Sequence, residues 1–154
     1  MSQATDFLEN TLVDMLLRGQ SATINGKTLS WSATPTLYLA LFTAAPSDAG
    51  GGTEVTGGSY ARVAITCSLA NWAGTQSAGS TAASSGTGGV SSNNGVQAFP
   101  APTASWGVVT HFAIMDDASA GNMLIWAPLG ISKTINNGDA APQFNAAALT
   151  VTFA

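Results

Sequence analysis

Charge is scarce in this 154-residue chain, which has four Lys and Arg and eight Asp and Glu and a formal net charge of −4. Charged residues make up 8% of it, against about 25% in a typical soluble domain, which argues against an enzyme because proton transfer and metal ligation need ionisable side chains. Scattered basic residues argue against a nucleic-acid partner, and the longest strongly apolar run, residues 37–42, is too short for a membrane-spanning helix.

An amphipathic helix is predicted over residues 5–18. Its apolar residues recur at helical spacing, and Arg18 followed by Gly19 suits the end of a helix. The helix either packs against its own domain or docks onto a neighbouring subunit. The apolar stripe comprises Phe7, Leu8, Leu12, Met15 and Leu16.

Beyond Gly19 the apolar period changes from 3.6 to 2. The Asn25-Gly26 pair is typical of a two-residue β-hairpin turn. Residues 36–42 and 60–69 alternate as strands. In the second of these, Cys67 falls on the apolar face, and we expect it to be a small buried side chain.

Residues 73–95 are rich in Ser, Thr and Gly and contain almost nothing to bury. We expect a long exposed loop, which is either an arm that contacts a partner or a flexible excursion. It is not a domain boundary, because the β-rich segments on either side are too short to form separate cores.

Further strands are predicted at residues 106–115, 123–127, 131–135 and 149–153, with a turn at 116–122. The sequence therefore predicts one domain over residues 1–154. This domain is mainly β, an antiparallel two-sheet β-sandwich of seven or eight strands over residues 20–154, with one N-terminal helix. A barrel is the alternative.

Catalytic and metal-binding patterns are not found. His111 is the one histidine and lies within a predicted strand, so we expect a structural role. Asp116 and Asp117 fit a turn better than a calcium loop, because the spacing of an EF-hand is missing. We predict no catalytic residue, no cofactor and no metal.

Glu54 and Arg62 flank a Gly57-Gly58 turn, and these opposite charges either meet across strands or face a neighbouring subunit. The simpler alternative is an exposed ion pair of little energetic value. We predict that assembly contacts involve the helix and this pair. The candidate residues are Phe7, Leu8, Leu12, Leu16, Glu54 and Arg62.

Several strings together resemble a family of small virion structural proteins of tailed bacteriophages. They are residues 36–46, 52–62, 106–116, 121–126 and 133–139, together with the N-terminal helix. Members of that family are tail-fibre or minor tail proteins, and similar β-domains serve as capsid cement. The resemblance implies a non-enzymatic virion protein made in the host bacterial cytoplasm.

A capsid cement or decoration protein, bound to the major capsid protein in many symmetric copies, is the function we favour from sequence. The small size, the acidic balance and the helix and loop available for bridging support it. The alternative is a tail-fibre or minor tail component that contacts other tail proteins or host glycans. In that case Trp72, Trp106 or Trp126 could stack on sugars, although tryptophan in a sandwich more often lies in the core.

Overall fold

The computed structural model describes residues 3–153, which form two compact units. The first unit contains the described parts of residues 1–35, 66–97 and 144–154, and the second contains residues 36–65 and 98–143. The chain therefore passes between the units four times. The single-domain organisation remains a prediction.

The N-terminal helix is confirmed close to its predicted limits. It runs as α1 (Asp6–Leu12) and continues into a π-helical turn, η1 (Val13–Leu17), and Gly19 follows with a φ of 65°. No helix among residues 3–153 combines the length and the apolar character needed to cross a bilayer.

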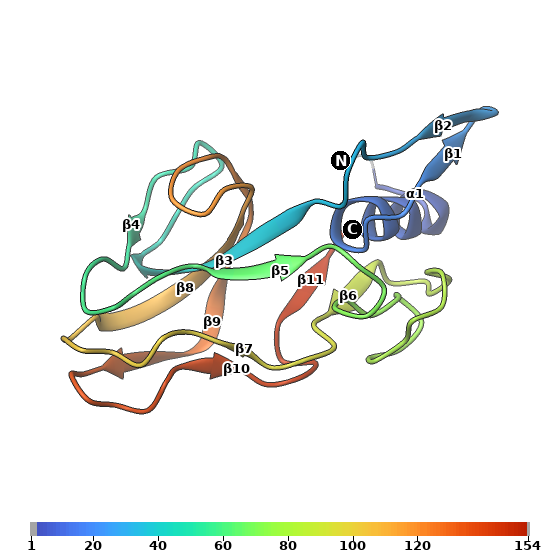
Figure 1. Cartoon of the computed structure of the whole chain (residues 1–154). Coiled ribbons are helices and arrows are strands. Elements are labelled where there is room, and N and C mark those ends of the chain that lie inside the picture. Colours follow the sequence, from blue (N-terminus) through green and yellow to red (C-terminus); the bar gives the residue numbers. More distant parts are fainter. Residues whose placement is uncertain (1–2, 154) are drawn as a thin grey trace. The chain divides into compact units, whose positions relative to one another are not determined.

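The first unit contains two pairs of short strands in addition to the helix (Figure 1). β1 (Ala22–Ile24) and β2 (Lys27–Leu29) form the predicted hairpin, and both turn residues, Asn25 and Gly26, have positive φ as a type I′ turn requires. β6 (Val90–Ser92) pairs with β11 (Thr150–Thr152) in antiparallel register. Trp72, Leu17 and Leu149 are the large apolar side chains at the centre of this unit.

The second unit is built on a five-stranded antiparallel sheet of order β4-β3-β8-β9, with β5 also paired to β3. The buried face of this sheet includes Leu39, Leu41 and Ile114, because alternate residues of a strand point to the same side. The strands are β3 (Thr36–Ala44), β4 (Thr53–Glu54), β5 (Val63–Thr66), β8 (Gly107–Met115) and β9 (Met123–Ile135).

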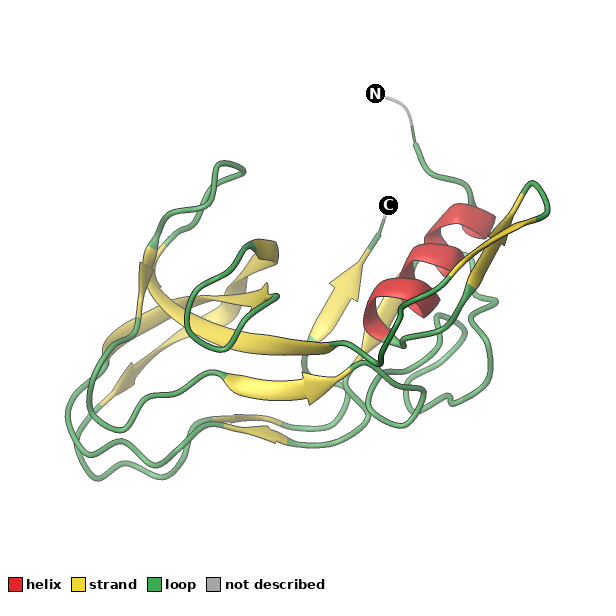
Figure 2. Cartoon of the chain, turned by 45° about the horizontal axis from the view of Figure 1, so that its top comes forward, coloured by secondary structure: helices red, strands yellow, loops and turns green. Residues whose placement is uncertain are grey.

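One further pair, β7 (Gln97–Ala98) with β10 (Gln143–Phe144), completes eleven strands among the described residues. Figure 2 shows how much of the chain between these strands is loop. The predicted class, mainly β and antiparallel with one N-terminal helix, is confirmed and is consistent with a β-sandwich, although the described strands form four sheets rather than two. The strand count exceeds seven or eight because several two-residue strands carry no readable alternation.

Two predicted strands have different lengths in the structure. The strand expected over residues 60–69 is reduced to β5, because Gly57, Gly58 and Ser59 all have positive φ and the preceding chain turns sharply. The strands expected at 123–127 and 131–135 instead form the single strand β9, which runs through Pro128. Proline is tolerated there because β9 lies at the edge of the sheet.

The 73–95 segment differs from the expected exposed loop at both ends. Ala73 is buried where the segment begins, and Ser91, Ser92 and Asn93 are buried where it ends in β6. The Asn93 side chain accepts the Leu149 N–H at 2.8 Å. This hydrogen bond fixes the residue that directly precedes β11. Only the middle of the segment is mostly exposed.

Candidate assembly surface

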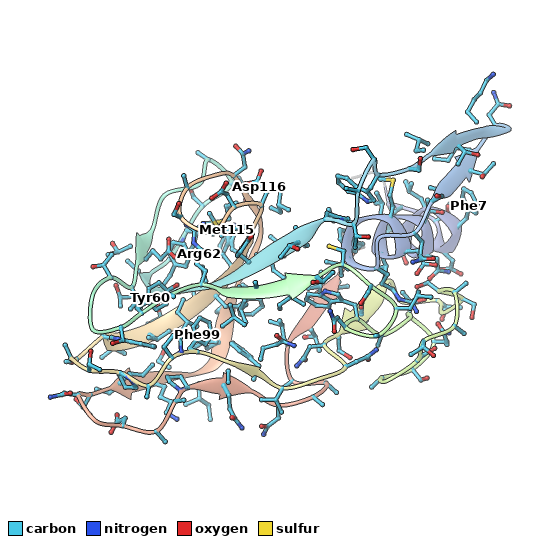
Figure 3. The ribbon with its side chains drawn as sticks, in the orientation of Figure 1. Phe7, Tyr60, Arg62, Phe99, Met115 and Asp116 are labelled. Carbon is cyan, nitrogen blue, oxygen red and sulfur yellow. The ribbon has the colours of Figure 1, made fainter. Side chains whose placement is uncertain are left out.

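Large apolar side chains are exposed along the N-terminal helix and the hairpin beside it. Between 38% and 62% of each side chain is accessible. We call this set the N-terminal apolar surface, and it comprises Phe7, Leu8, Ile24, Leu29 and Trp31. Figure 3 places Phe7 on the helix, close to the hairpin.

The hairpin cannot bury its own apolar residues. Ala22, Ile24 and Leu29 share one face of the two strands, because Ala22 lies directly opposite Leu29 and alternate residues share a side. Ala22 is buried, whereas the other two remain more than 40% exposed. The Trp31 indole N–H donates to the Met15 carbonyl at 2.7 Å, which holds the chain after β2 against the helix.

The helix packs against its own unit with a different face from the predicted stripe. Val13 and Leu17 are fully buried, whereas Leu12 and Leu16 are half-buried and Phe7 and Leu8 are exposed. Glu9, Val13 and Leu17 recur every fourth residue, so this buried face continues from the α-helix through the π-helical turn. Of the four predicted helix residues, Phe7 and Leu8 are exposed, whereas Leu12 and Leu16 are partly covered within the unit, and their role in assembly remains a prediction.

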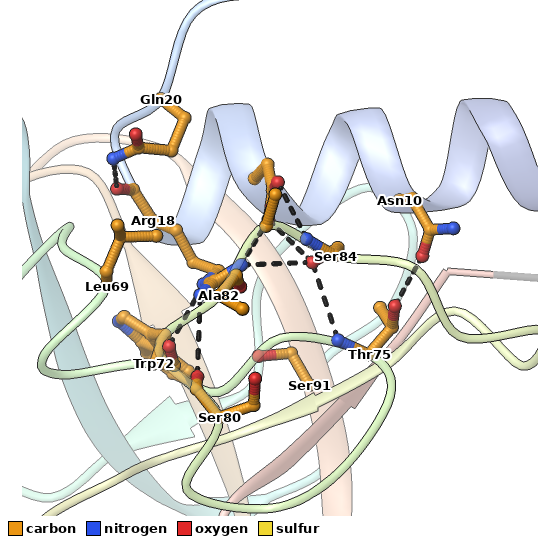
Figure 4. Close-up of polar contacts among 12 residues, drawn as sticks. Asn10, Arg18, Gln20, Leu69, Trp72, Thr75, Ser80, Ala82, Ser84 and Ser91 are labelled. Atoms are coloured by element: carbon orange, nitrogen blue, oxygen red, sulfur yellow. Dashed lines mark hydrogen bonds and ion pairs between the residues drawn. The ribbon is translucent and has the colours of Figure 1, made fainter.

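The polar face of the same helix anchors the Ser/Thr/Gly-rich segment (Figure 4). Arg18 is fully buried and donates to the carbonyls of Trp72, Ser80 and Ala82 at 3.1, 3.4 and 2.6 Å. It also forms an ion pair with Asp14 at 2.5 Å, and the Asp14 carboxylate accepts the backbone N–H of Ser84 at 3.0 Å.

One turn earlier on the helix, Asn10 donates to the Gly86 carbonyl at 3.0 Å and accepts a hydrogen bond from the Thr75 hydroxyl. Asn10, Asp14 and Arg18 are spaced four residues apart and so lie on one face. Sequence reasoning missed this role. The sequence carries no signal for it, because the partners of Arg18 are mainly main-chain carbonyls far along the chain.

Glu54 and Arg62 meet within the second unit, as one of the predicted alternatives required. Arg62 binds the Glu54 carboxylate through two hydrogen bonds of 2.8 and 2.7 Å. Its remaining donors reach the carbonyls of Asp117 and Ala120 at 2.6 and 2.8 Å, so it holds the 116–122 turn. The side chains are 7% and 23% exposed, which excludes a fully exposed ion pair.

Tyr60 completes this cluster (Figure 3). Its hydroxyl donates to Glu54 at 3.0 Å and accepts the Leu41 N–H at 2.9 Å. Burial raises the pKa of the phenol well above its ordinary value, and the adjacent Glu54 carboxylate raises it further. Its ring stacks on Phe99 and meets Trp106 edge-on, so the cluster is tied to the core.

The acidic segment at 116–122 is a turn, as predicted. The Asp116 carboxylate accepts the side-chain amide and the backbone N–H of Asn122 at 2.8 and 2.6 Å, and these donors lower its pKa. Across residues 3–153, no group of three or more His, Cys, Asp or Glu side chains is arranged to hold a metal ion.

The exposure of the remaining predicted residues shows which of them lie in the core. Cys67 is buried, as are Trp72 and Trp106, whereas Trp126 is half-exposed on β9. His111 is half-buried on β8, and its Nδ1 shares a hydrogen bond with the adjacent Thr110 hydroxyl. Of the three tryptophans considered for sugar stacking, only Trp126 is accessible.

A family model described as Podophage GP4 fiber I protein gp80 matches residues 3–152. The chain belongs to this family. The resemblance to virion structural proteins of tailed phages is thereby confirmed, and the protein is a structural component of a phage virion, made in the host cytoplasm. No curated protein matches the chain.

Membership of the gp80 family bears on the two functions left open by the sequence. The family description names a fibre, which supports the tail-fibre alternative better than the capsid cement or decoration role that we favoured. The partners are other virion proteins. The small size and acidic balance that suggested cement are equally compatible with a fibre component.

Proposed function

We propose that this chain is a non-enzymatic component of a phage tail fibre, attached to other virion proteins through the N-terminal apolar surface. The observation that carries the proposal is the exposure of five large apolar side chains on one helix, one hairpin and the chain that follows the hairpin. An isolated two-stranded hairpin is marginally stable in water, and a partner that covers Ile24 and Leu29 would stabilise it.

A non-enzymatic role is supported by how the carboxylates are used. Asp14 holds Arg18 and Ser84, Glu54 holds Arg62 and Tyr60, and Asp116 closes its own turn. These contacts occupy three of the eight acidic groups of the chain with structural hydrogen bonds. Hydrolysis of a glycoside would need a pair of carboxylates that face a substrate.

Incorporation into phage particles tests the attachment surface. Phages lacking this gene product would be complemented with the unchanged chain, with Phe7→Ser/Leu29→Ser, or with Val96→Ser as a matched control, because Val96 is exposed outside the surface. We expect the double variant to fold, by circular dichroism, and to be depleted from purified particles. Normal incorporation of the double variant would contradict the proposal.

The position in the virion and the absence of catalysis have separate tests. Imaging of labelled particles should place the chain on the tail, and copies spread over the head shell would restore the cement hypothesis. Purified chain incubated with host-envelope polysaccharide should release no shorter saccharides. Turnover that is lost on changing one carboxylate would show that the protein is an enzyme.

A further inference from the structure

One face of the five-stranded sheet combines aromatic side chains with two small residues at its centre. The strand register places nine residues in three rows across β3, β8 and β9, and we call them the aromatic face. The rows are Tyr38, Met115, Met123; Ala40, Ala113, Trp126; and Phe42, His111, Pro128.

Three of the larger side chains of this face pack over a buried cluster formed by Ala40, Phe42, Ala113 and Met115, and these three stay partly exposed. Ala40 and Ala113 are fully buried, so the larger side chains around them must shield them from solvent. Tyr38, Met123 and Trp126 pack against the cluster that contains these alanines and remain partly exposed. The Tyr38 and Trp126 rings are therefore held on the sheet with part of their surface facing solvent, whereas Phe42 is buried beneath the face.

Hydrogen-bonding groups border these rings. Among the described residues, the Tyr38 hydroxyl and the Trp126 indole N–H have no hydrogen-bond partner. The His111 ring lies 5.9 Å from the Trp126 ring, tilted by 52°, and its Nδ1 is engaged by Thr110. Apolar rings and available polar atoms thus lie side by side.

An open recess of about 290 Å³ adjoins the aromatic face. Phe42, Met115 and Met123 belong to both, and Figure 3 shows Met115 next to Asp116 of the adjoining turn. Gly50, Gly51 and Gly52, all with φ near 80°, bring main chain to the wall of the recess. Glu54 also lines it, and its carboxylate is already paired with Arg62.

We propose that the aromatic face and this recess bind a neutral saccharide. A sugar ring has a C–H face that stacks on aromatic rings and a rim of hydroxyls that bond to polar groups, so it matches Trp126, Tyr38 and His111. A neutral sugar is indicated because none of the nine positions is charged. The inference rests on the proposed fibre role, in which a host-surface glycan is a natural ligand.

The size of the face argues against a second copy of the chain as the occupant. From Tyr38 to Phe42 is about 14 Å along the strand, and β3 to β9 is about 10 Å across, a footprint of about 140 Å². A stable protein interface buries about 800 Å² on each partner. One or two sugar rings fit the smaller footprint.

The four tryptophans of the chain provide a direct test. In the ¹⁵N-labelled full chain, each indole N–H gives one NMR signal, and Trp126→Phe identifies the signal of Trp126. Maltohexaose, laminarihexaose and chitohexaose are the probes. We expect at least one of them to shift the Trp126 signal saturably and to leave that of Trp31, the exposed internal control, unmoved.

Variants then separate binding from folding. Trp126→Ala is expected to weaken saccharide binding by about tenfold or more, and Trp31→Ala to leave it unchanged. His111→Ala serves as a second variant at the face. The inference is overturned if no probe moves the Trp126 signal, if Trp31 responds equally, or if the signal shifts with protein concentration alone, which would indicate self-association.

This outcome is independent of the attachment test. Trp126→Ala should still enter phage particles, whereas Phe7→Ser/Leu29→Ser should still bind the saccharide. If the unchanged chain binds none of the three saccharides, the inference is overturned and the fibre proposal is unaffected.

Discussion

Replacing Arg18 by Met is expected to release the Ser/Thr/Gly-rich segment from the helix and to destabilise the first unit. The methionine stem keeps most of the apolar packing, but five hydrogen bonds are lost, three of them to backbone carbonyls. Breaking a buried ion pair by removing one partner costs about 3–5 kcal/mol. For a chain of this size, that corresponds to a decrease in Tm of roughly 6–20 °C.

Two measurements check this prediction. Thermal unfolding by circular dichroism gives the change in Tm, and hydrogen exchange followed by mass spectrometry reports protection within residues 74–86. Lys27→Met is the matched control, because Lys27 is exposed on the hairpin, and its effect should stay within about 0.5 kcal/mol. Asp14→Asn should cost less than Arg18→Met, since the three carbonyls would keep their donor.

The reasoning is refuted if Arg18→Met and Lys27→Met lower Tm equally, or if exchange within residues 74–86 is the same in both variants. Either result would mean that the segment keeps its conformation without the guanidinium.

Three further predictions concern the second unit and the turns. Arg62→Met should lower the free energy of unfolding by about 2–4 kcal/mol because Glu54 and two carbonyls lose their donor. Urea titration measures this, and a loss below about 1 kcal/mol would contradict it. Because the folded-state pKa of Tyr60 is raised, its contribution to stability is complete below the ordinary value of 10.0 and is lost as pH rises above it. Tyr60→Phe should therefore show a shallower fall in Tm above pH 10 than the unchanged chain, and parallel curves would refute this. Gly19→Ala should cost about 2–5 kcal/mol, since its Cβ would lie 2.6 Å from a carbonyl oxygen at a φ of +65°. Gly26→Ala, with a φ of +70° and open space, isolates the backbone strain of about 1–2 kcal/mol, and equal losses would exclude the steric effect.

Sequence patterns predicted the elements that depend on local periodicity. The helix, the Asn25-Gly26 hairpin and the long strands β3 and β8 follow from apolar spacing and turn residues. The meeting of Glu54 and Arg62 was one of the predicted arrangements, because few other charges were available for either residue.

Features that depend on distant main chain could not be predicted. Arg18 binds carbonyls 54–64 positions away, and a carbonyl has no sequence signature. The buried face of the helix was missed for another reason, since it begins with Glu9, a charged residue that carries no apolar signal, and continues through Val13 and Leu17. Similarly, Trp126 lies beside Ala113 only through the register of β8 and β9.

The anchoring of residues 73–95 has a consequence for how this segment can evolve. Arg18 holds it mainly through main-chain oxygens, which every amino acid supplies equally. Substitutions among small residues at Ser80 or Ala82 therefore leave these contacts in place. We expect related phages to vary this segment at its exposed positions while retaining the arginine, Thr75, Ser84 and the tightly packed Gly86, so that a stretch of variable composition keeps a fixed course.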